Sequence, residues 1–177
     1  VALVKADGSG EVTNLTESGY SDGNAKWVLD GKAMIWNSDR AGYRSHGSWG
    51  AERDIYIMFF DGEAYDKFRQ SKEETALLED DEQKDKKDDK DDKEADKKEE
   101  KADKPVEPLK VDLANRQDRV IRLTAHSSHL GDAVLSQKGD KLYYCATFEK
   151  GYDLWEQDLK ERSTKLLLKE VGGGTLL

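Results

Sequence analysis

The chain has 177 residues, enough for one domain, and a formal net charge of −9. The tract from Ser71 to Lys104 holds sixteen acidic and ten lysine residues and carries −6 of that charge, so the rest of the chain is close to neutral. No basic stripe is present that could neutralise phosphates, which argues against nucleic acid as a partner. No apolar run approaches the ~20 residues of a membrane-spanning helix, so no membrane span is predicted.

The first residues predict two short strands. Residues 1–6 and 11–15 lie on either side of Asp7-Gly8, and an Asp-Gly pair between apolar runs favours a tight hairpin. We interpret residues 1–16 as the last strands of a preceding structural repeat.

Residues 17–62 contain the strands of a first repeat. Strands are predicted at 25–29 and 33–36, on either side of an Asp-Gly turn, and at 54–60. The third of these strands is apolar on both faces, which is typical of a strand that is covered from both sides.

A long insertion, residues 63–108, interrupts this repeat. It begins with helical spacing at 63–68 and 73–78, and almost every residue from 79 to 104 is charged. Such a segment has too little apolar surface to offset the entropy of ordering the chain. We expect a solvated, mobile insertion with a helix at its start.

Residues 109–124 are predicted to close the first repeat, with strands at 110–113 and 119–124 around a polar turn. A second repeat follows over residues 125–177. Its predicted strands span residues 133–136, 141–146, 152–158 and 164–169. Cys145 lies in one of them and is interpreted as a buried, inert thiol.

The two repeats match at an offset of 108 positions. Asn14-Leu15-Thr16 and Arg122-Leu123-Thr124 occupy equivalent places, and so do residues 27–36 and 135–144. Correction for the long insertion and for a nine-residue insert within 41–51 leaves a period of about 53 residues, close to the ~40–50 of β-propeller repeats. We therefore predict an all-β fold with about two four-stranded antiparallel blades. Because such repeats are stable in stacks of about three or more, the chain is expected to be a piece of a longer protein.

The insert within 41–51 contains the candidate recognition residues. Tyr43, Arg44, His46 and Trp49 are residue types that anchor recognition, and inserts in repeat proteins often form loops on the binding face. The alternative is that Tyr43 and Trp49 simply cover the edge of their own blade. The sequence leaves both interpretations open.

Signals for catalysis or for a metal are sparse. Ser48 lies in Gly-Ser-Trp-Gly, but His46 stands where a nucleophile-elbow motif requires glycine. His126 and His129 have no third ligand nearby, and the charged tract offers no defined cation cage. We predict no catalytic residue, no metal site and no cofactor. A small enzyme that uses Ser48 or the histidines is kept as an alternative.

Three segments of the first repeat follow a known pattern: Trp27-Val28-Leu29-Asp30-Gly31-Lys32, Ile35-Trp36-Asn37-Ser38-Asp39-Arg40 and Asp54-Ile55-Tyr56. They resemble the TolB-type propeller repeat, which has the form W-S-P-D-G-K, apolar strand, S-D-R and D-I-Y. Val-Leu replaces its usual Ser-Pro, and the second repeat lacks the Trp and the Ser-Asp-Arg. With residues 43–50, the charged insertion and residues 148–155, the whole chain resembles the N-terminal propeller of bacterial tricorn-like serine proteases.

This resemblance implies a propeller of about six blades that precedes a PDZ module and a tail-specific-protease-type catalytic core. The core carries the catalytic serine, outside this chain, and the propeller gates or channels peptides. The implied partners are the remaining blades, the PDZ and catalytic modules and peptides, with self-association as a further option. The implied location is the periplasm, with the cytoplasm as the alternative. The runner-up function is a binding-only TolB-like propeller that mediates protein–protein interaction.

Overall fold

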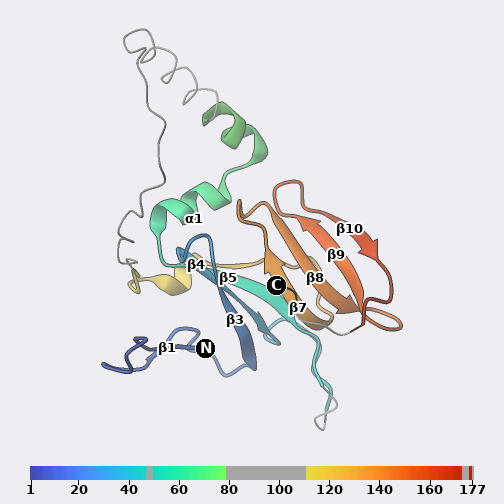
Figure 1. Ribbon diagram of the computed structural model, residues 1–177, viewed down its shortest axis with the longest axis horizontal. Helices are drawn as coiled ribbons and strands as arrows, with labels where there is room; N and C mark the ends of the chain where they lie inside the picture. Colours follow the sequence, from blue (N-terminus) through green and yellow to red (C-terminus); the bar gives the residue numbers. More distant parts are fainter. Residues whose placement is uncertain (47–49, 79–110, 173–175, 177) are drawn as a thin grey trace, which may run out of the picture.

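The computed structural model describes residues 1–46, 50–78, 111–172 and 176. Within them, antiparallel β-structure dominates, as one two-stranded hairpin and two four-stranded sheets (Figure 1). The hairpin pairs β1 (Ala2–Leu3) with β2 (Thr13–Asn14). The first sheet consists of β3 (Asp22–Val28), β4 (Ala33–Ser38), β5 (Asp54–Phe59) and β6 (Val120–Arg122). The second sheet consists of β7 (His129–Leu135), β8 (Lys141–Thr147), β9 (Asp153–Asp158) and β10 (Ser163–Leu168).

Both sheets are meanders in which each strand pairs with the next one along the chain. The prediction of four-stranded antiparallel sheets is thereby confirmed, and the described residues are mostly β, with helix at the start of the long insertion. In the first sheet the β5–β6 pair forms across the long charged insertion, since Ile57 lies opposite Ile121 in the register. The insertion is thus carried by one hairpin connection and does not disturb the strand order.

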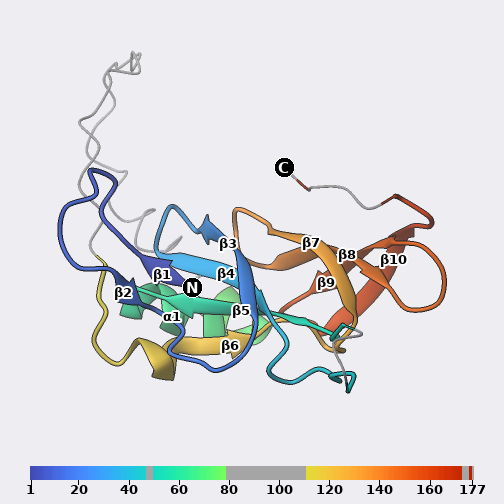
Figure 2. The ribbon, with the colours of Figure 1, turned by 90° about the horizontal axis from the view of Figure 1, so that it is seen from below.

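The strand β5 is buried on both faces, as predicted. Ile55, Ile57 and Phe59 belong to the core between the two sheets, which also contains Leu142 and Tyr144 of the second sheet. The alternate side chains of β5 face the opposite way, into a smaller cluster with residues of the N-terminal hairpin. Figure 2 shows the first sheet between the β1–β2 hairpin and the second sheet.

The first strand of each sheet is irregular at the same place. The register of β3 shifts between Gly23 and Lys26, and that of β7 shifts between Leu130 and Ala133. The segments Gly23-Asn24-Ala25 and Gly131-Asp132-Ala133 are 108 positions apart, so the sequence repeat extends to this bulge. A bulge bends its strand and increases the local twist.

The helix α1 (Gly62–Arg69) forms at the start of the long insertion, as the helical spacing predicts. The carboxylate of Asp61 caps it by accepting from the amide of Ala64 over 2.7 Å. The ring of Phe68 lies 5.0 Å from that of Phe59, which docks the helix on the core. Residues 72–78 are also helical, and the charged residues 79–110 lie outside the described part. No helix in the described residues is long and apolar enough to cross a membrane.

The prediction of a strand at 110–113 is wrong for residues 111–113, the part of this segment that the structure describes. Asp112 makes a single backbone bond to the carbonyl of Phe60, over 3.1 Å, and residues 111–113 are not in a strand. A left-handed residue, Asn115, then leads into a short 3₁₀ helix, η1 (Arg116–Arg119). The guanidinium of Arg119 donates to three nearby carbonyls, so side-chain bonds hold this segment in place of a strand ladder.

Candidate functional site

The predicted recognition insert extends the β4–β5 hairpin at one end of the first sheet. The amide of Glu52 donates to the carbonyl of Tyr43 over 2.9 Å. Gly42 permits this close approach, since a Cβ at that position would lie 2.0 Å from the backbone oxygen of Glu52. Ser48 and Trp49, which the sequence singled out, lie outside the described residues.

Arg44 is the predicted recognition residue whose side chain makes defined contacts. Its guanidinium lies 4.5 Å from the centroid of the Tyr20 ring, a cation–π distance, and its Nε donates to the backbone oxygen of Asp39 over 3.3 Å. The Arg44 side chain is 46% exposed and Tyr20 is 45% exposed, so this stack lies at the surface. Tyr43 and His46 are exposed beside it. The structure thus brings Arg44 together with Tyr20.

Tyr20 is a site residue that the sequence interpretation missed. It lies in the connection between β2 and β3, far from the insert in sequence. The available signal was a single aromatic residue in the polar run Glu17-Ser18-Gly19-Tyr20-Ser21, just before the first strand. Its partner could not be read from the sequence, because contact with Arg44 depends on which connections meet at one end of the sheet.

Arg40 lies beneath the surface pair, among aromatic rings. Its guanidinium carbon is 4.8 Å from the ring centroid of Tyr56, 5.5 Å from that of Trp36 and 5.9 Å from that of Tyr20. One terminal nitrogen is 3.5 Å from a carboxylate oxygen of Asp22. The Ser-Asp-Arg residues of the repeat therefore build the floor under the exposed Arg44–Tyr20 stack.

Hydrogen bonds keep Asp22 ionised in this floor. Burial opposes its negative charge, but hydrogen bonds from Ser18, Ser38 and Thr16 outweigh burial and hold the pKa of Asp22 below its ordinary value. The Ser18 hydroxyl donates to it over 2.5 Å and the Trp36 Nε1 over 3.3 Å. The carboxylate balances the Arg40 charge and fixes the connection that carries Tyr20.

A second buried carboxylate, that of Asp54, links the first residue of β5 to the connection between the sheets. Asp54 is 0% exposed and accepts from the Thr124 hydroxyl over 2.7 Å, from Ser127 over 2.8 Å and from the Arg122 Nε over 3.0 Å. Burial raises the pKa of neighbouring Tyr56, and the Asp54 charge adds to that rise. Every polar atom of Asp54 is used structurally, so its role here is to fix the crossover between the sheets.

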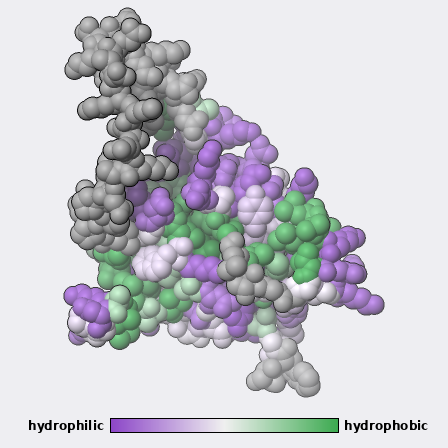
Figure 3. All heavy atoms as spheres, in the orientation of Figure 1, coloured by the Kyte–Doolittle hydropathy of each residue, from purple (hydrophilic) through white to green (hydrophobic). Residues whose placement is uncertain are grey.

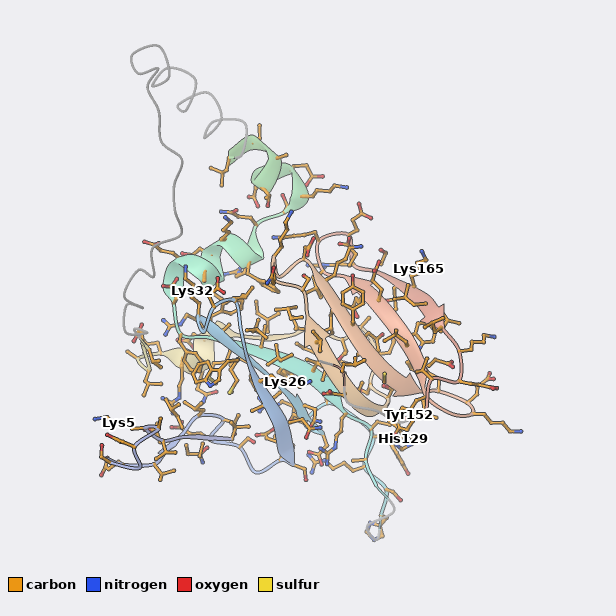
Figure 4. All side chains as sticks on the ribbon, in the orientation of Figure 1. Lys5, Lys26, Lys32, His129, Tyr152 and Lys165 are labelled. Atoms are coloured by element: carbon orange, nitrogen blue, oxygen red, sulfur yellow. The ribbon has the colours of Figure 1, made fainter. Side chains whose placement is uncertain are left out.

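Polar contacts also join the two sheets directly at their first strands. Lys26 of β3 donates to the Asp132 carboxylate of β7 over 2.7 Å and to the Ala133 carbonyl over 3.2 Å. Figure 4 labels Lys26 between the two sheets. The backbones of Arg53 and Ser128 exchange two further hydrogen bonds, of 2.7 and 3.1 Å. The sheets are therefore fixed against each other by ionic and backbone contacts as well as by the apolar core.

The remaining sequence candidates are dispersed. His126 and His129 are both exposed, in the connection before β7 and at its first residue. No group of three or more His, Cys, Asp or Glu side chains that could hold a metal lies in the described part of the chain. Cys145 is buried, as predicted, and burial raises the pKa of its thiol, which disfavours the reactive thiolate.

No family model matches this sequence, and no curated protein is significantly similar to it. Function is therefore inferred from the residues and their geometry. These offer an exposed guanidinium stacked on tyrosine, on a rigid polar and aromatic floor, at one end of a pair of packed sheets. Such an arrangement is suited to binding, with aromatic and arginine anchors.

Proposed function

We propose that the two sheets are successive blades of a TolB-like β-propeller in a tricorn-like serine peptidase. The propeller is non-catalytic and gates or channels peptides toward a catalytic core outside these residues. The observation that carries the proposal is the equivalence of the two sheets, since both are four-stranded meanders with the same bulge in the first strand. Radial repetition of such sheets is the architecture of a propeller.

The connections between strands support the same proposal. Leu15-Thr16 and Leu123-Thr124 are buried, and each pair immediately precedes the connection into the first strand of a four-stranded sheet. The β1–β2 hairpin ends at the first of these pairs, in the position that β6 has relative to the second pair. This order favours the interpretation of β1 and β2 as the outer strands of a preceding blade.

Peptide binding is assigned to the Arg44–Tyr20 stack and the exposed residues Tyr43 and His46 beside it. Strand connections at the end of a propeller are free to vary while the blades stay fixed, which suits them for recognition. Arg44 can offer hydrogen-bond donors to peptide carbonyls and carboxylates, and the tyrosine rings can pack against apolar side chains. The rigid floor of Arg40 and Asp22 preorganises this surface.

Binding is tested with fluorescently labelled peptides from a protein digest and the purified chain, by fluorescence anisotropy. The variant Arg44→Lys should bind several-fold more weakly, because lysine keeps the charge but loses the planar stack on Tyr20. Arg69→Lys is the matched control, since Arg69 stacks on Tyr65 at 5.3 Å, away from this surface. Equal loss in both variants would count against the assigned surface.

The peptidase proposal is tested with an antibody raised against residues 111–172 and an extract of the source cells. We expect a native polypeptide several-fold larger than 20.0 kDa whose immunoprecipitate hydrolyses peptides and is blocked by a serine-directed covalent inhibitor. Hydrolysis by the isolated chain would overturn the non-catalytic assignment. Fractionation of the same cells tests the periplasmic location.

The second candidate is a binding-only propeller. It is favoured by the exposed Arg44–Tyr20 stack, which is a recognition feature that needs no attached enzyme. A larger native polypeptide that binds peptides without hydrolysing them would select this function over the peptidase.

A further inference from the structure

The second sheet has one covered face and one free face. Leu142, Tyr144 and Ala146 of β8 point into the core shared with the first sheet. The alternate side chains of β8, Tyr143 and Cys145, point the other way. The strand register aligns this second set with further residues, so the free face consists of Val134, Tyr143, Leu154, Glu156 and Leu168, with the buried Cys145 at one end of it.

The corresponding face of the first sheet is the one that packs against the second sheet. Ile35 lies opposite Ile57 in the β4–β5 register, as Tyr143 lies opposite Glu156 in the β8–β9 register. Ile35 and Ile57 are 2% and 0% exposed, because the second sheet covers them. The first sheet therefore turns this face toward the sheet that follows it in the chain, and the repeat predicts the same orientation for the second sheet.

The free face is apolar on one side and ionic on the other. Leu168 is 58% exposed and Leu154 is partly exposed. On the other side, Lys141 and Glu156 form an ion pair of 3.1 Å, where the first sheet has the buried Ala33 and Ile57. Figure 3 shows a hydrophobic area over the β9–β10 part of the second sheet. A partner for this face must combine apolar contact at Leu154 and Leu168 with tolerance of the ion pair.

We propose that the free face of the second sheet is the docking face for a third four-stranded β-meander. The occupant presents the face that the second sheet presents to the first, with large apolar and aromatic side chains. This continues the interface between the two described sheets. The inference rests on the proposed propeller architecture, and it is independent of whether the whole protein hydrolyses peptides.

A second copy of this chain does not fit as the occupant. The face that it would have to present is that of Met34, Trp36 and Met58 in its first sheet. Leu3 and Leu15, with Val111 and Leu113, already pack against that cluster. Docking of a copy would require displacement of these segments, whereas a further meander of the same polypeptide needs none.

Photo-cross-linking identifies the occupant. The benzophenone residue p-benzoylphenylalanine replaces Leu168 in the protein expressed at its native length in the source cells. Phe148 carries the same probe as a control, since it is 49% exposed but lies in the β8–β9 turn against Trp155. After irradiation, the cross-linked peptides are identified by mass spectrometry.

We expect cross-links at position 168, several-fold above the control, to a β-strand segment of the same polypeptide outside residues 1–172. Cross-links to residues 1–172 of a second copy would overturn the proposal and make the face a homo-oligomer interface. A yield at position 168 no higher than at position 148 would show that the face is solvated and would also overturn it. The cross-linking experiment does not measure peptide hydrolysis. Failure of the docking proposal can therefore be distinguished from failure of the peptidase proposal.

Discussion

The two sheets have the same strand order but very different burial. All twelve residues of β4 and β5 in the first sheet are buried, whereas their counterparts β8 and β9 in the second sheet hold five buried residues, Leu142, Tyr144, Cys145, Ala146 and Gln157. The first sheet lies between the β1–β2 hairpin and the second sheet, and the second sheet is covered on one face. Burial in this fold is therefore set by what covers a sheet, since the internal pairing of both sheets is alike.

The residue types follow this difference. Where the first sheet has Ile57, at 0% exposure, the second has Glu156 in an ion pair with Lys141. An ionised side chain is costly to bury unless it is paired, so Glu156 is compatible with a wetter environment than Ile57. The two positions therefore form a matched pair for mutation.

The largest effect is expected for Ile57→Ala compared with Glu156→Ala. Removal of the Ile57 side chain leaves a cavity between the sheets and should lower the free energy of unfolding by about 2–5 kcal/mol. Glu156→Ala should change it by no more than about 1 kcal/mol, as expected for loss of a partly exposed ion pair. Urea unfolding followed by tryptophan fluorescence measures both. Equal effects would mean that the two sheets are covered alike.

The connections between strands also differ between the sheets. The first sheet joins β4 to β5 through the insert within residues 41–51, where Gly42 contacts the backbone of Glu52. The second sheet joins β8 to β9 by a short turn around Gly151, which has a positive φ of 68°. The insert thus adds a packed backbone contact that has no counterpart in the second sheet.

Gly42→Ala tests how tightly that insert is packed. The added methyl group would meet the Glu52 backbone, so the insert must move, at a cost of about 1–3 kcal/mol in the free energy of unfolding. Gly19→Ala is the control, since a Cβ there meets nothing within 4 Å. Thermal unfolding of both variants checks this. A Gly42→Ala variant as stable as the control would show that the insert is loosely held.

The sequence was sufficient to predict most strands, for identifiable reasons. Asp30-Gly31 separates two apolar runs, and the alternation of Ile55, Tyr56 and Ile57 fits a strand with two covered faces. The segment 110–113 has a similar alternation, but in its described part only Asp112 bonds to a neighbouring backbone, that of Phe60, and η1 occupies the place of the turn. Local pattern indicates a strand, and only the pairing of the whole sheet decides whether it forms.

The candidate site was predicted less completely than the strands. Arg44 was found because its insert is absent from the second repeat. Tyr20 was missed because its contact with Arg44 joins two connections that are distant in sequence. Arg40 was noted as part of a repeat pattern, but its position among three aromatic rings depends on tertiary packing.

Asp132→Asn tests the ion pair that joins the sheets. Burial opposes ionisation of Asp132, but hydrogen bonds from Lys26 and from the backbone outweigh it and hold the pKa below its ordinary value of 3.8. A carboxyl whose pKa is lowered by folding stabilises the fold at every pH above its ordinary pKa. This stabilisation is lost as the pH falls through the lowered pKa of the folded state. The variant should lose about 1–2 kcal/mol at neutral pH. Its stability should then fall less steeply than wild type below pH 3.8.

Urea unfolding at a series of pH values measures that difference in slope. The double variant Lys26→Met, Asp132→Asn is the control for the pair, since the two single effects should not add if the side chains act together. Parallel pH profiles of wild type and Asp132→Asn would contradict a role for this carboxylate in joining the sheets.

The smallest effect is expected where the long insertion meets the second sheet. Lys160, in the β9–β10 turn, donates to the carbonyls of Phe68 and Gln70 over 2.9 and 2.7 Å, and burial lowers its pKa. A cation at the C-terminus of a helix stabilises it by about 0.3–1 kcal/mol. Lys160→Met should therefore speed amide hydrogen exchange in α1 by up to about fivefold, given the RT of ~0.6 kcal/mol.

Lys165→Met is the control for this exchange experiment, since Lys165 is exposed on β10. It removes the same charge from the second sheet without touching α1. If Lys160→Met accelerates exchange in α1 and leaves β4 and β5 protected, the helix is a local attachment of the insertion to the second sheet. Faster exchange throughout both sheets would instead make α1 a clamp on which the packing of the two sheets depends.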